Sequence, residues 1–398
     1  MRNGVRVGVD GTSWLNRRGF GRFARNAVTR LVELDRERTY VILIGERDAA
    51  AASLPDRAEL RLVALAGPSE ATQGRPSRGL LDLLRLTLAA TRAELDAILF
   101  PSVYTYFPVP RVPTIVGLHD STAEDFPELT LAGRRERLFW RSKQRLALRQ
   151  AASLFTVSEA ARDALADRLG IAPELLPVIP EAPDPVFRPR GAAECDAALA
   201  RLGLESRAPF LLYSGGINPH KNLETLLGAY AVLAGRGDPT PLALVGELES
   251  DPYVSAARAV RDRIAALGLE GRVHLLGYVS DDDLACLYSR STAFVNPSLS
   301  EGFGLPGVEA AACGAPVVLS DLPAHRETMD GAALFFPPRD VEALAAQLEH
   351  VLGDDELRRS LAERAREAVA RLSWDATAEQ LRALVAAVAP AACGTRSG

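Results

Sequence analysis

The stretch that decides the fold runs from Ala293 to Leu319 and reads AFVNPSLSEGFGLPGVEAAACGAPVVL. Short apolar runs at 293–295 and 316–319 predict two buried strands. Between them a glycine-rich segment leads to Pro306, which suits the first turn of a helix, and Gly314 suits the position just beyond its end. A strand, a loop, a helix and a second strand in this order predict a parallel sheet.

The same alternation of apolar runs and amphipathic segments extends over the whole chain of 398 residues. It predicts further strands at 5–9, 40–44, 60–65, 97–100, 114–118, 154–157, 210–213, 242–245, 273–276 and 333–336. Helical segments, such as those at 23–34 and 79–95, lie between several of these strands, so helices should cover both faces of each sheet.

A proline-rich segment at 177–189 divides this pattern into two halves. Such a run makes a stiff connection and cannot form a helix. We therefore predict an α/β protein with two doubly wound domains, an N-terminal one at 1–182 and a C-terminal one at 183–375. A helix and a frayed tail at 376–398 would follow, and this helix could pack back on the N-terminal domain.

The bulk composition excludes several classes of protein. With 47% hydrophobic and 24% charged residues, the chain is typical of a globular protein. A formal net charge of -5 argues against a nucleic-acid-binding protein, which normally carries a basic surplus. The four cysteines are scattered and indicate reduced thiols, and no apolar run is long enough to span a bilayer. We expect a cytoplasmic protein that at most rests on the inner face of a membrane.

The segment from Ser300 to Glu309 carries the strongest functional signal. Its glycines let the backbone approach a ligand closely, and the free N–H groups of the following helix start attract an anion such as a diphosphate. Glu301 and Glu309 are better suited to accepting hydrogen bonds from hydroxyl groups, which a sugar and a ribose would supply. The alternative interpretation is that Glu309 complements the helix dipole and Glu301 is solvated.

A second glycine turn follows the strand that ends near Tyr213. Gly215 and Gly216 form this turn, and Asn222 marks the start of a helix because asparagine is a good N-cap residue. In a sugar transfer the leaving group is a nucleoside diphosphate, which gains negative charge as its bond to the sugar breaks. Lys221 would place a positive charge beside that diphosphate. The other interpretation is a solvated surface lysine.

His119 and Asp120 directly follow the predicted strand at 114–118, where a ligand of a parallel sheet would be met. Asp120 could instead cap a helix, and His119 could be a satisfied interior group. Nearer the N-terminus, Gly19 and Gly21 could cover the phosphates of a nucleotide-sugar donor, or they could admit the acceptor to which the sugar is transferred. Their spacing also fits the dinucleotide fingerprint of a dehydrogenase, but that pattern requires a strand that runs directly into the glycines, and residues 10–18 intervene.

Two runs of charge have competing interpretations. Asp281, Asp282 and Asp283 follow Ser280, and three acids in the first turn of a capped helix complement its dipole, so we predict no metal site here. The segment from Arg134 to Arg149 holds seven basic residues against Glu136 alone, with apolar residues interleaved. It is either a solvated basic face or a peripheral contact with an anionic membrane.

The segment from Ser300 to Glu309 resembles the signature of family 4 of the retaining glycosyltransferases, in which Glu-Gly-Phe-Gly-Leu-Pro precedes a second glutamate. Four further stretches are similar to the family's pattern: Gly277 to Ser280, Asn296 to Ser298, Gly314 to Val318 and Pro323 to Glu327. The resemblance implies the GT-B fold, in which two Rossmann-like domains face each other across a cleft. Where many relatives carry an arginine, this chain has Gly216 and His220.

The resemblance implies that Glu309 binds the ribose, and that Glu301 and His119 contact the transferred sugar. The residues that we expect to be catalytic are His119, Lys221 and Glu301. Those that we expect to hold the donor are Gly21, Gly215, Gly216, Val279, Phe303, Gly304, Leu305 and Glu309, with Val279 near the base. We expect no metal and no cofactor besides the donor substrate.

These expectations combine into one hypothesis of function. The protein would transfer a hexose, of mannose or glucose type, from a nucleotide-diphosphate sugar to a hydroxyl group of a saccharide or lipid-linked acceptor. The resemblance implies front-face attack with retention at the anomeric carbon, and the leaving phosphate would take the acceptor's proton. Two alternatives stay open: a nucleotide-sugar epimerase of the same fold, and a non-catalytic nucleotide-sugar-binding protein.

Overall fold

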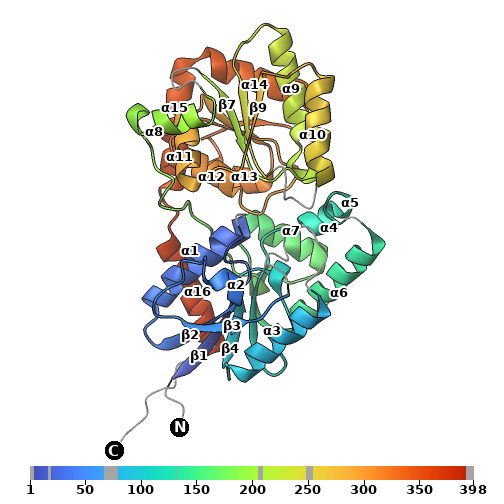
Figure 1. Cartoon of the computed structure of the whole chain (residues 1–398), viewed down its shortest axis with the longest axis vertical. Coiled ribbons are helices and arrows are strands. Elements are labelled where there is room, and N and C mark those ends of the chain that lie inside the picture. Colours follow the sequence, from blue (N-terminus) through green and yellow to red (C-terminus); the bar gives the residue numbers. More distant parts are fainter. Residues whose placement is uncertain are drawn as a thin grey trace, which may run out of the picture. The chain divides into compact units, whose positions relative to one another are not determined.

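The computed structural model describes residues 4–16, 19–66, 79–131, 133–204, 209–247 and 254–390. The chain forms two compact units (Figure 1). Unit 1 comprises Met1–Asp120, Leu131–Glu181 and Ser373–Gly398, and unit 2 comprises Ser121–Thr130 and Ala182–Leu372. The units divide after Glu181, where we had placed the domain boundary after residue 182, and the grouping of Ser121–Thr130 with unit 2 has no counterpart in the sequence prediction.

Unit 1 is built on a six-stranded parallel sheet of order β3-β2-β1-β4-β5-β6. Its strands are β1 (Val5–Asp10), β2 (Arg38–Gly45), β3 (Glu59–Val63), β4 (Ala97–Phe100), β5 (Thr114–Gly117) and β6 (Ala151–Phe155). Its helices are α1 (Gly19–Leu34), α2 (Glu46–Ala49), α3 (Leu80–Arg92), α6 (Arg134–Gln150), α7 (Glu159–Leu169) and α16 (Trp374–Val388), with short 3-10 turns η1 (Val103–Thr105) and η2 (Pro173–Leu175).

The C-terminal helix α16 belongs to the core of unit 1, where it packs against α1 (Figure 1). Phe23 of α1 lies between the rings of Phe155 and Trp374, at centroid distances of 5.6 and 6.1 Å. Arg38 donates from Nε to the carbonyl oxygen of Ala389 at 3.0 Å. The last helix of the chain therefore completes the unit that its first helix begins.

The prediction of a buried strand at 60–65 was wrong about burial. Strand β3 forms at Glu59–Val63, but it lies at the edge of the sheet and pairs only with β2. Leu60 and Leu62 are exposed, and Val63 alone is buried. At the edge of the sheet fewer neighbouring elements cover the side chains of β3 than those of the central strands.

Unit 2 repeats this architecture with a six-stranded parallel sheet of order β12-β11-β10-β7-β8-β9. Its strands are β7 (Leu211–Ser214), β8 (Leu242–Val245), β9 (Val273–Gly277), β10 (Ala293–Asn296), β11 (Val317–Ser320) and β12 (Leu334–Phe336). Its helices are α4 (Thr122–Asp125), α5 (Pro127–Thr130), α8 (Ala192–Arg201), α9 (Leu223–Gly235), α10 (Val254–Ala266), α11 (Asp281–Arg290), α12 (Leu305–Ala312), α13 (Pro323–Met329), α14 (Val341–Gly353) and α15 (Asp355–Val369), with the 3-10 turn η3 (Pro219–Lys221).

The core of unit 2 lies between its sheet and helices α9, α10 and α14, with α15 at its margin. Leu226, Tyr230 and Leu344 are fully buried there against sheet residues such as Leu244 and Val295. Helices α11 and α12 lie on the opposite face (Figure 1). Because β11, β10 and β7 are parallel neighbours, the loops that follow them leave the same edge of the sheet.

Candidate functional site

Lys221 and Glu301 form a direct ion pair at this edge of unit 2. Lys221 ends η3, which follows β7, whereas Glu301 lies in the loop that follows β10. The Nζ atom of Lys221 lies 2.7 Å from Oε1 of Glu301, and both side chains are largely shielded from solvent. Two side chains that we had predicted to serve one site therefore touch.

Glu301 is held in its charged form. Burial raises the pKa of this carboxyl group, but the charge of Lys221, the charge that His325 carries at low pH and the hydrogen bonds outweigh burial and lower the pKa to about 2. Besides Lys221, Ser298 Oγ and Asn296 Nδ2 donate to Oε1, at 2.7 and 3.3 Å. In the described part of the chain all three donors reach Oε1, so Oε2 is the oxygen that a ligand hydroxyl could reach.

Asn222 occupies the N-cap position of α9, but it does not cap the helix as we predicted. Its backbone is left-handed, with φ of 55°, and its side chain makes no capping hydrogen bond. Instead Nδ2 donates to the carbonyl oxygen of Pro297 at 3.0 Å, and Oδ1 accepts from Thr225 at 2.9 Å. Asn222 thus ties the turn that carries Lys221 to the loop that carries Glu301.

The start of α12 forms an anion-binding geometry beside this pair. Gly304 is the N-cap residue, with φ of 81°, a conformation that favours glycine. The first backbone bond of the turn runs from Gly307 N–H to Gly304 O at 2.9 Å, so the N–H groups before it have no partner within the helix. Phe303 and Leu305 flank Gly304 and are buried, and Glu309 is 3% exposed, one turn into α12.

His325 lies behind this turn, and we did not predict a role for it. It is fully buried in α13, which follows β11, and its Nδ1 lies 2.8 Å from the carbonyl oxygen of Ser320. A Cβ atom on Gly304 would lie only 2.8 Å from Cδ2 of the imidazole. In the sequence, a role for His325 was indicated only by its place in the stretch from Pro323 to Glu327, which is similar to the family's pattern.

The glycine turn after β7 is closed by Tyr213, whose hydroxyl group donates to the carbonyl oxygen of Gly216 at 2.6 Å. Gly215 has φ of 151°, and its carbonyl oxygen would lie 2.5 Å from a Cβ atom on Gly246. Val279 is buried just beyond the end of β9, two strands away in the same sheet. The structure thus places these predicted donor-binding residues on the loops of one sheet.

The segment Ser121–Thr130 adds a contact to the site in unit 2 that the sequence did not reveal. The hydroxyl groups of Thr122 and Ser300 lie 2.9 Å apart. Helix α5 packs against η3, the turn that ends at Lys221. Two short helices that we had not predicted therefore support both loops of the ion pair.

His119 lies in unit 1, with a hydrogen bond at one ring nitrogen and a carboxyl group near the other. Its Nε2 lies 2.8 Å from the carbonyl oxygen of Pro101, and its Nδ1 lies 3.5 Å from Oε1 of Glu181. Burial lowers the pKa of His119, but the carboxylate of Glu181 outweighs this effect, so the pKa is raised. Contact of His119 with a donor sugar stays a prediction. The neighbouring Asp120 accepts a hydrogen bond from the Tyr104 hydroxyl group at 3.3 Å.

Gly21 lies inside a helix rather than in the loop that we expected. Helix α1 begins at Gly19, so the predicted glycine loop is its first turn. A Cβ atom on Gly21 would lie 2.0 Å from the carbonyl oxygen of Asn16. Close packing of α1 on the loop after β1 is therefore a sufficient reason for this glycine, and its contact with a donor stays a prediction.

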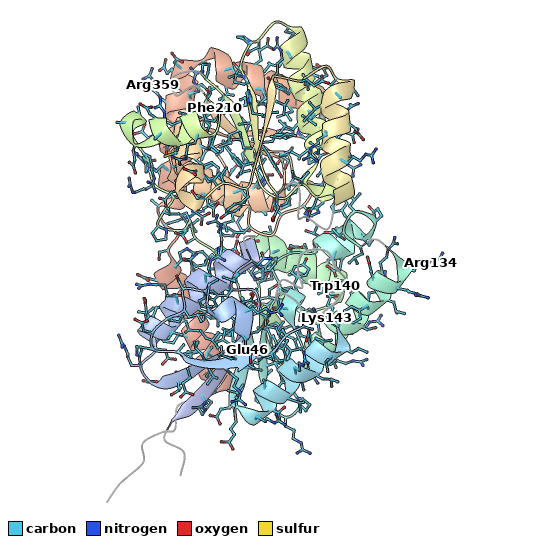
Figure 2. All side chains as sticks on the ribbon, in the orientation of Figure 1. Glu46, Arg134, Trp140, Lys143, Phe210 and Arg359 are labelled. Carbon is cyan, nitrogen blue, oxygen red and sulfur yellow. The ribbon has the colours of Figure 1, made fainter. Side chains whose placement is uncertain are left out.

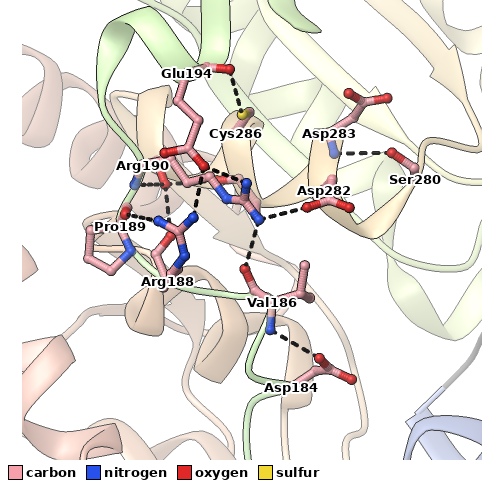
Figure 3. Close-up of polar contacts among 12 residues, drawn as sticks. Asp184, Val186, Arg188, Pro189, Arg190, Glu194, Ser280, Asp282, Asp283 and Cys286 are labelled. Carbon is pink, nitrogen blue, oxygen red and sulfur yellow. Dashed lines mark hydrogen bonds and ion pairs between the residues drawn. The ribbon is translucent and has the colours of Figure 1, made fainter.

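The acidic run at the start of α11 pairs with two arginines, and Figure 3 shows the pair of Asp282 with Arg190. Arg190 donates to Asp282 Oδ1 at 2.7 Å, and Arg201 lies 2.6 Å from Asp283 Oδ1. Ser280 Oγ accepts from the backbone N–H of Asp283 at 3.1 Å, which is the predicted helix cap. Among the described residues, no group of three or more His, Cys, Asp or Glu side chains is arranged to hold a metal ion.

The basic segment from Arg134 to Arg149 lies on helix α6 of unit 1. Arg134 points away from the unit, whereas Trp140 and Lys143 lie on the inner side of the helix (Figure 2). Trp140 stacks on Tyr104 at a centroid distance of 5.0 Å, and Leu138 on the outer side is 66% exposed. None of the helices in the described ranges combines the length and the apolarity that crossing a bilayer requires.

The fold, two doubly wound units, and the comparison with known sequences together define the class of protein: it is a glycosyltransferase of the GT-B fold. Residues 17–186 match the profile of Glycosyltransferase Family 4, and residues 196–368 match that of glycosyl transferases group 1. The chain belongs to this family of glycosyltransferases.

Curated relatives include two mannosyltransferases. The O-antigen chain mannosyltransferase B of Escherichia coli is 35% identical over 190 residues, which are 48% of each chain. The MMP alpha-(1->4)-mannosyltransferase of Mycolicibacterium hassiacum is 34% identical over 242 residues, 60% of this chain and 54% of the relative. The chain spans about half of the length of these two relatives.

Solved structures share the fold over nearly the whole chain. Sucrose-phosphate synthase from Thermosynechococcus elongatus has a TM-score of 0.76 at 21% identity and covers 97% of this chain and 99% of its own. Anabaena HepE in complex with UDP-glucose has a TM-score of 0.72 at 19% identity, with 96% and 99% covered. At these identities the likeness concerns the fold alone.

Proposed function

We propose that the protein transfers a hexose, of mannose or glucose type, from a nucleotide-diphosphate sugar to a hydroxyl group of a saccharide or lipid-linked acceptor, with retention at the anomeric carbon. The observation that carries this proposal is the Lys221–Glu301 ion pair beside the start of α12. It combines a fixed cation, an ionised carboxylate and free backbone N–H groups on one edge of a sheet, which suits a sugar diphosphate.

Each group has a distinct part in the proposed reaction. The N–H groups at the start of α12 would hold the diphosphate, and Lys221 would stabilise the negative charge that it gains as the bond to the sugar breaks. Glu301 stays ionised and would accept a hydrogen bond from a sugar hydroxyl group through Oε2. Glu309 would bind the ribose. The new bond would form on the face that the diphosphate leaves, and the departing phosphate would take the acceptor's proton.

The relatives support the choice of donor and acceptor. The Escherichia coli relative is named a mannosyltransferase of an O-antigen chain, and HepE is described in complex with UDP-glucose. Both names concern a hexose, and the first concerns a saccharide product. On this basis we propose a hexosyl donor, with GDP-mannose and UDP-glucose as the first two donors to test.

The variant Lys221→Ala tests the proposal. It should lower the turnover of sugar transfer by about 100-fold or more, because a fixed charge beside the leaving group stabilises the transition state more than the ground state. Turnover would be followed as release of GDP or UDP in the presence of a saccharide acceptor mixture. Arg236→Ala is the matched control, since Arg236 is a cation in unit 2 that pairs with Glu349 on the exposed surface.

The outcomes separate the proposal from its alternatives. Equal turnover of Lys221→Ala and wild type would contradict the role of the ion pair. Altered nucleotide sugar released without any acceptor would indicate an epimerase. Saturable nucleotide binding without turnover under any condition would indicate a non-catalytic binding protein.

We also propose that the outer side of α6 rests on an anionic lipid surface. Five arginines are exposed there: Arg134, Arg135, Arg141, Arg145 and Arg149. Leu138 and Leu146 are exposed among them, and a basic helix with exposed apolar residues fits the boundary of an anionic membrane. Such a contact would suit a lipid-linked acceptor.

A further inference from the structure

His325 is a buried imidazole whose protonation state can be derived from its contacts. Its side chain is 1% exposed, and its Nδ1 lies 2.8 Å from the carbonyl oxygen of Ser320. A carbonyl oxygen can only accept, so the hydrogen atom of this bond belongs to Nδ1. In the neutral ring, Nε2 therefore carries a lone pair rather than a hydrogen atom.

The Nε2 atom has no hydrogen-bond partner in the part of the chain that the structure describes. Its neighbour is the turn at the start of α12: a Cβ atom on Gly304 would lie 3.2 Å from Nε2. A buried polar atom without a partner is unfavourable and calls for an explanation. The atom lies beside the turn whose N–H groups we propose to hold the diphosphate.

Four charged or polar groups act on this ring from the elements around it. Burial lowers the pKa of His325, and Lys221 at the end of η3 lowers it further. Glu301 after β10, Asp321 after β11 and the carbonyl group of Ser320 raise it, but by less in total. The pKa of His325 is therefore lowered, and the ring is neutral at pH 7 before any ligand binds.

We infer that His325 takes up a proton from solvent when the diphosphate of the donor binds at the start of α12, so that Nε2–H donates a hydrogen bond to a phosphate oxygen. This inference rests on the proposed function. A neutral ring would point its lone pair at the anion, which is repulsive, whereas a bound anion favours the imidazolium form. The proton completes the hydrogen bonds of a nitrogen that otherwise has none.

The inference gives His325 a role that Lys221 does not have. Lys221 already forms an ion pair with Glu301. His325 would become charged only when the phosphates are present, which adds a second cation without leaving an unpaired buried charge in the empty site. We therefore assign to His325 the coupling of donor binding to the uptake of one proton.

Isothermal titration calorimetry of the whole protein with GDP and with UDP tests this inference. At about pH 8 the last proton of each nucleotide is already lost, because it titrates near about pH 6. Titrations in buffers of different ionisation enthalpy should reveal net proton uptake on binding. In wild type, affinity should also fall about tenfold between about pH 7 and pH 8.5, since deprotonation removes a charge-assisted hydrogen bond.

Two variants locate the proton. His325→Gln should abolish proton uptake and flatten the pH dependence, because its side-chain amide can donate without titrating. His220→Gln is the matched control: it removes the other histidine near Lys221 and should leave proton uptake unchanged. Uptake that persists in His325→Gln, or that disappears in His220→Gln, would overturn the inference.

If His325→Gln does not fold, the calorimetric titrations of the wild-type protein still decide whether the inference holds. A binding heat that is the same in every buffer, with an affinity that does not vary with pH, would overturn the inference and leave the proposed function intact. Absence of binding by every nucleoside diphosphate, with ADP and dTDP tested as well as GDP and UDP, would overturn the proposed function, and this inference with it.

Discussion

At the scale of single residues, the contacts around Gly304 show how the site combines close packing with unusual backbone geometry. Gly304 has φ of 81° and lies against the ring of His325, so two separate constraints exclude a side chain there. Gly314, just beyond the end of α12, shares the first constraint only: its φ is 83°, but the space where a Cβ atom would lie is open. The two glycines therefore allow steric clash and backbone strain to be measured separately.

We expect Gly304→Ala to cost about 3 kcal/mol or more in the free energy of unfolding of unit 2, from strain of about 1–2 kcal/mol and a clash in addition. Gly314→Ala should cost only the strain, about 1–2 kcal/mol. Urea unfolding followed by hydrogen exchange of the backbone N–H groups of unit 2 would measure both, because all three tryptophans of the chain lie in unit 1. Equal losses in the two variants would contradict the packing of His325 against Gly304.

The charge of Glu301 makes a second residue-scale prediction. Its folded pKa of about 2 lies below its ordinary value of 4.5, so its ion pair contributes stability above about pH 4.5 and loses it as the pH falls toward 2. The melting temperatures of wild type and Glu301→Gln should therefore differ most at about pH 6 and converge only near about pH 2. A difference that stays constant across this range would contradict the depressed pKa.

At the scale of elements, helix α6 presents different chemistry on its two sides. The inner side is fixed by Trp140, which stacks on Tyr104, and by Lys143, which donates to the Tyr104 carbonyl oxygen at 2.6 Å. The outer side carries exposed arginines and Leu138. Because the inner contacts hold the helix without the arginines, the outer side can be altered without unfolding it.

The double variant Arg141→Glu with Arg145→Glu should weaken binding to anionic vesicles by about 10-fold or more, since each basic residue near such a surface contributes about 1 kcal/mol. Co-sedimentation with vesicles of phosphatidylglycerol and phosphatidylcholine would measure it. Vesicles of phosphatidylcholine alone are the control, and they should bind wild type and variant equally weakly. Strong binding of the variant to anionic vesicles would show that α6 is a solvated face.

At the scale of the whole molecule, the alternation of apolar runs was enough to predict a strand that overlaps each strand of both sheets, because buried parallel strands leave a strong local signal. The bounds of β6 were wrong, since it begins at Ala151 and ends at Phe155, whereas we had placed the strand at 154–157. The same signal overstated the burial of β3, since composition does not show which strand lies at an edge. The Glu301 motif and Lys221 were found because each follows a strand. His325, Thr122 and Glu181 were missed because their importance depends on tertiary neighbours, Gly304, Ser300 and His119.

Removal of residues 373–398 tests the division of the chain into units. Loss of α16 would uncover Phe23 and remove Trp374, a buried aromatic residue whose loss alone costs about 3–5 kcal/mol. Limited proteolysis should then degrade residues of unit 1 while unit 2 stays protected. Equal protection of both units would show that α16 is dispensable for the core of unit 1.

The position of α16 has a consequence for the order in which the two units can fold during synthesis on the ribosome. Every residue of unit 2 up to Leu372 is translated before Trp374, so unit 2 can mature while the earlier-made unit 1 still lacks its closing helix. Domains generally fold in the order of synthesis, and this chain would reverse that order. During that interval Phe23 lacks the ring of Trp374, on which it packs in the finished unit.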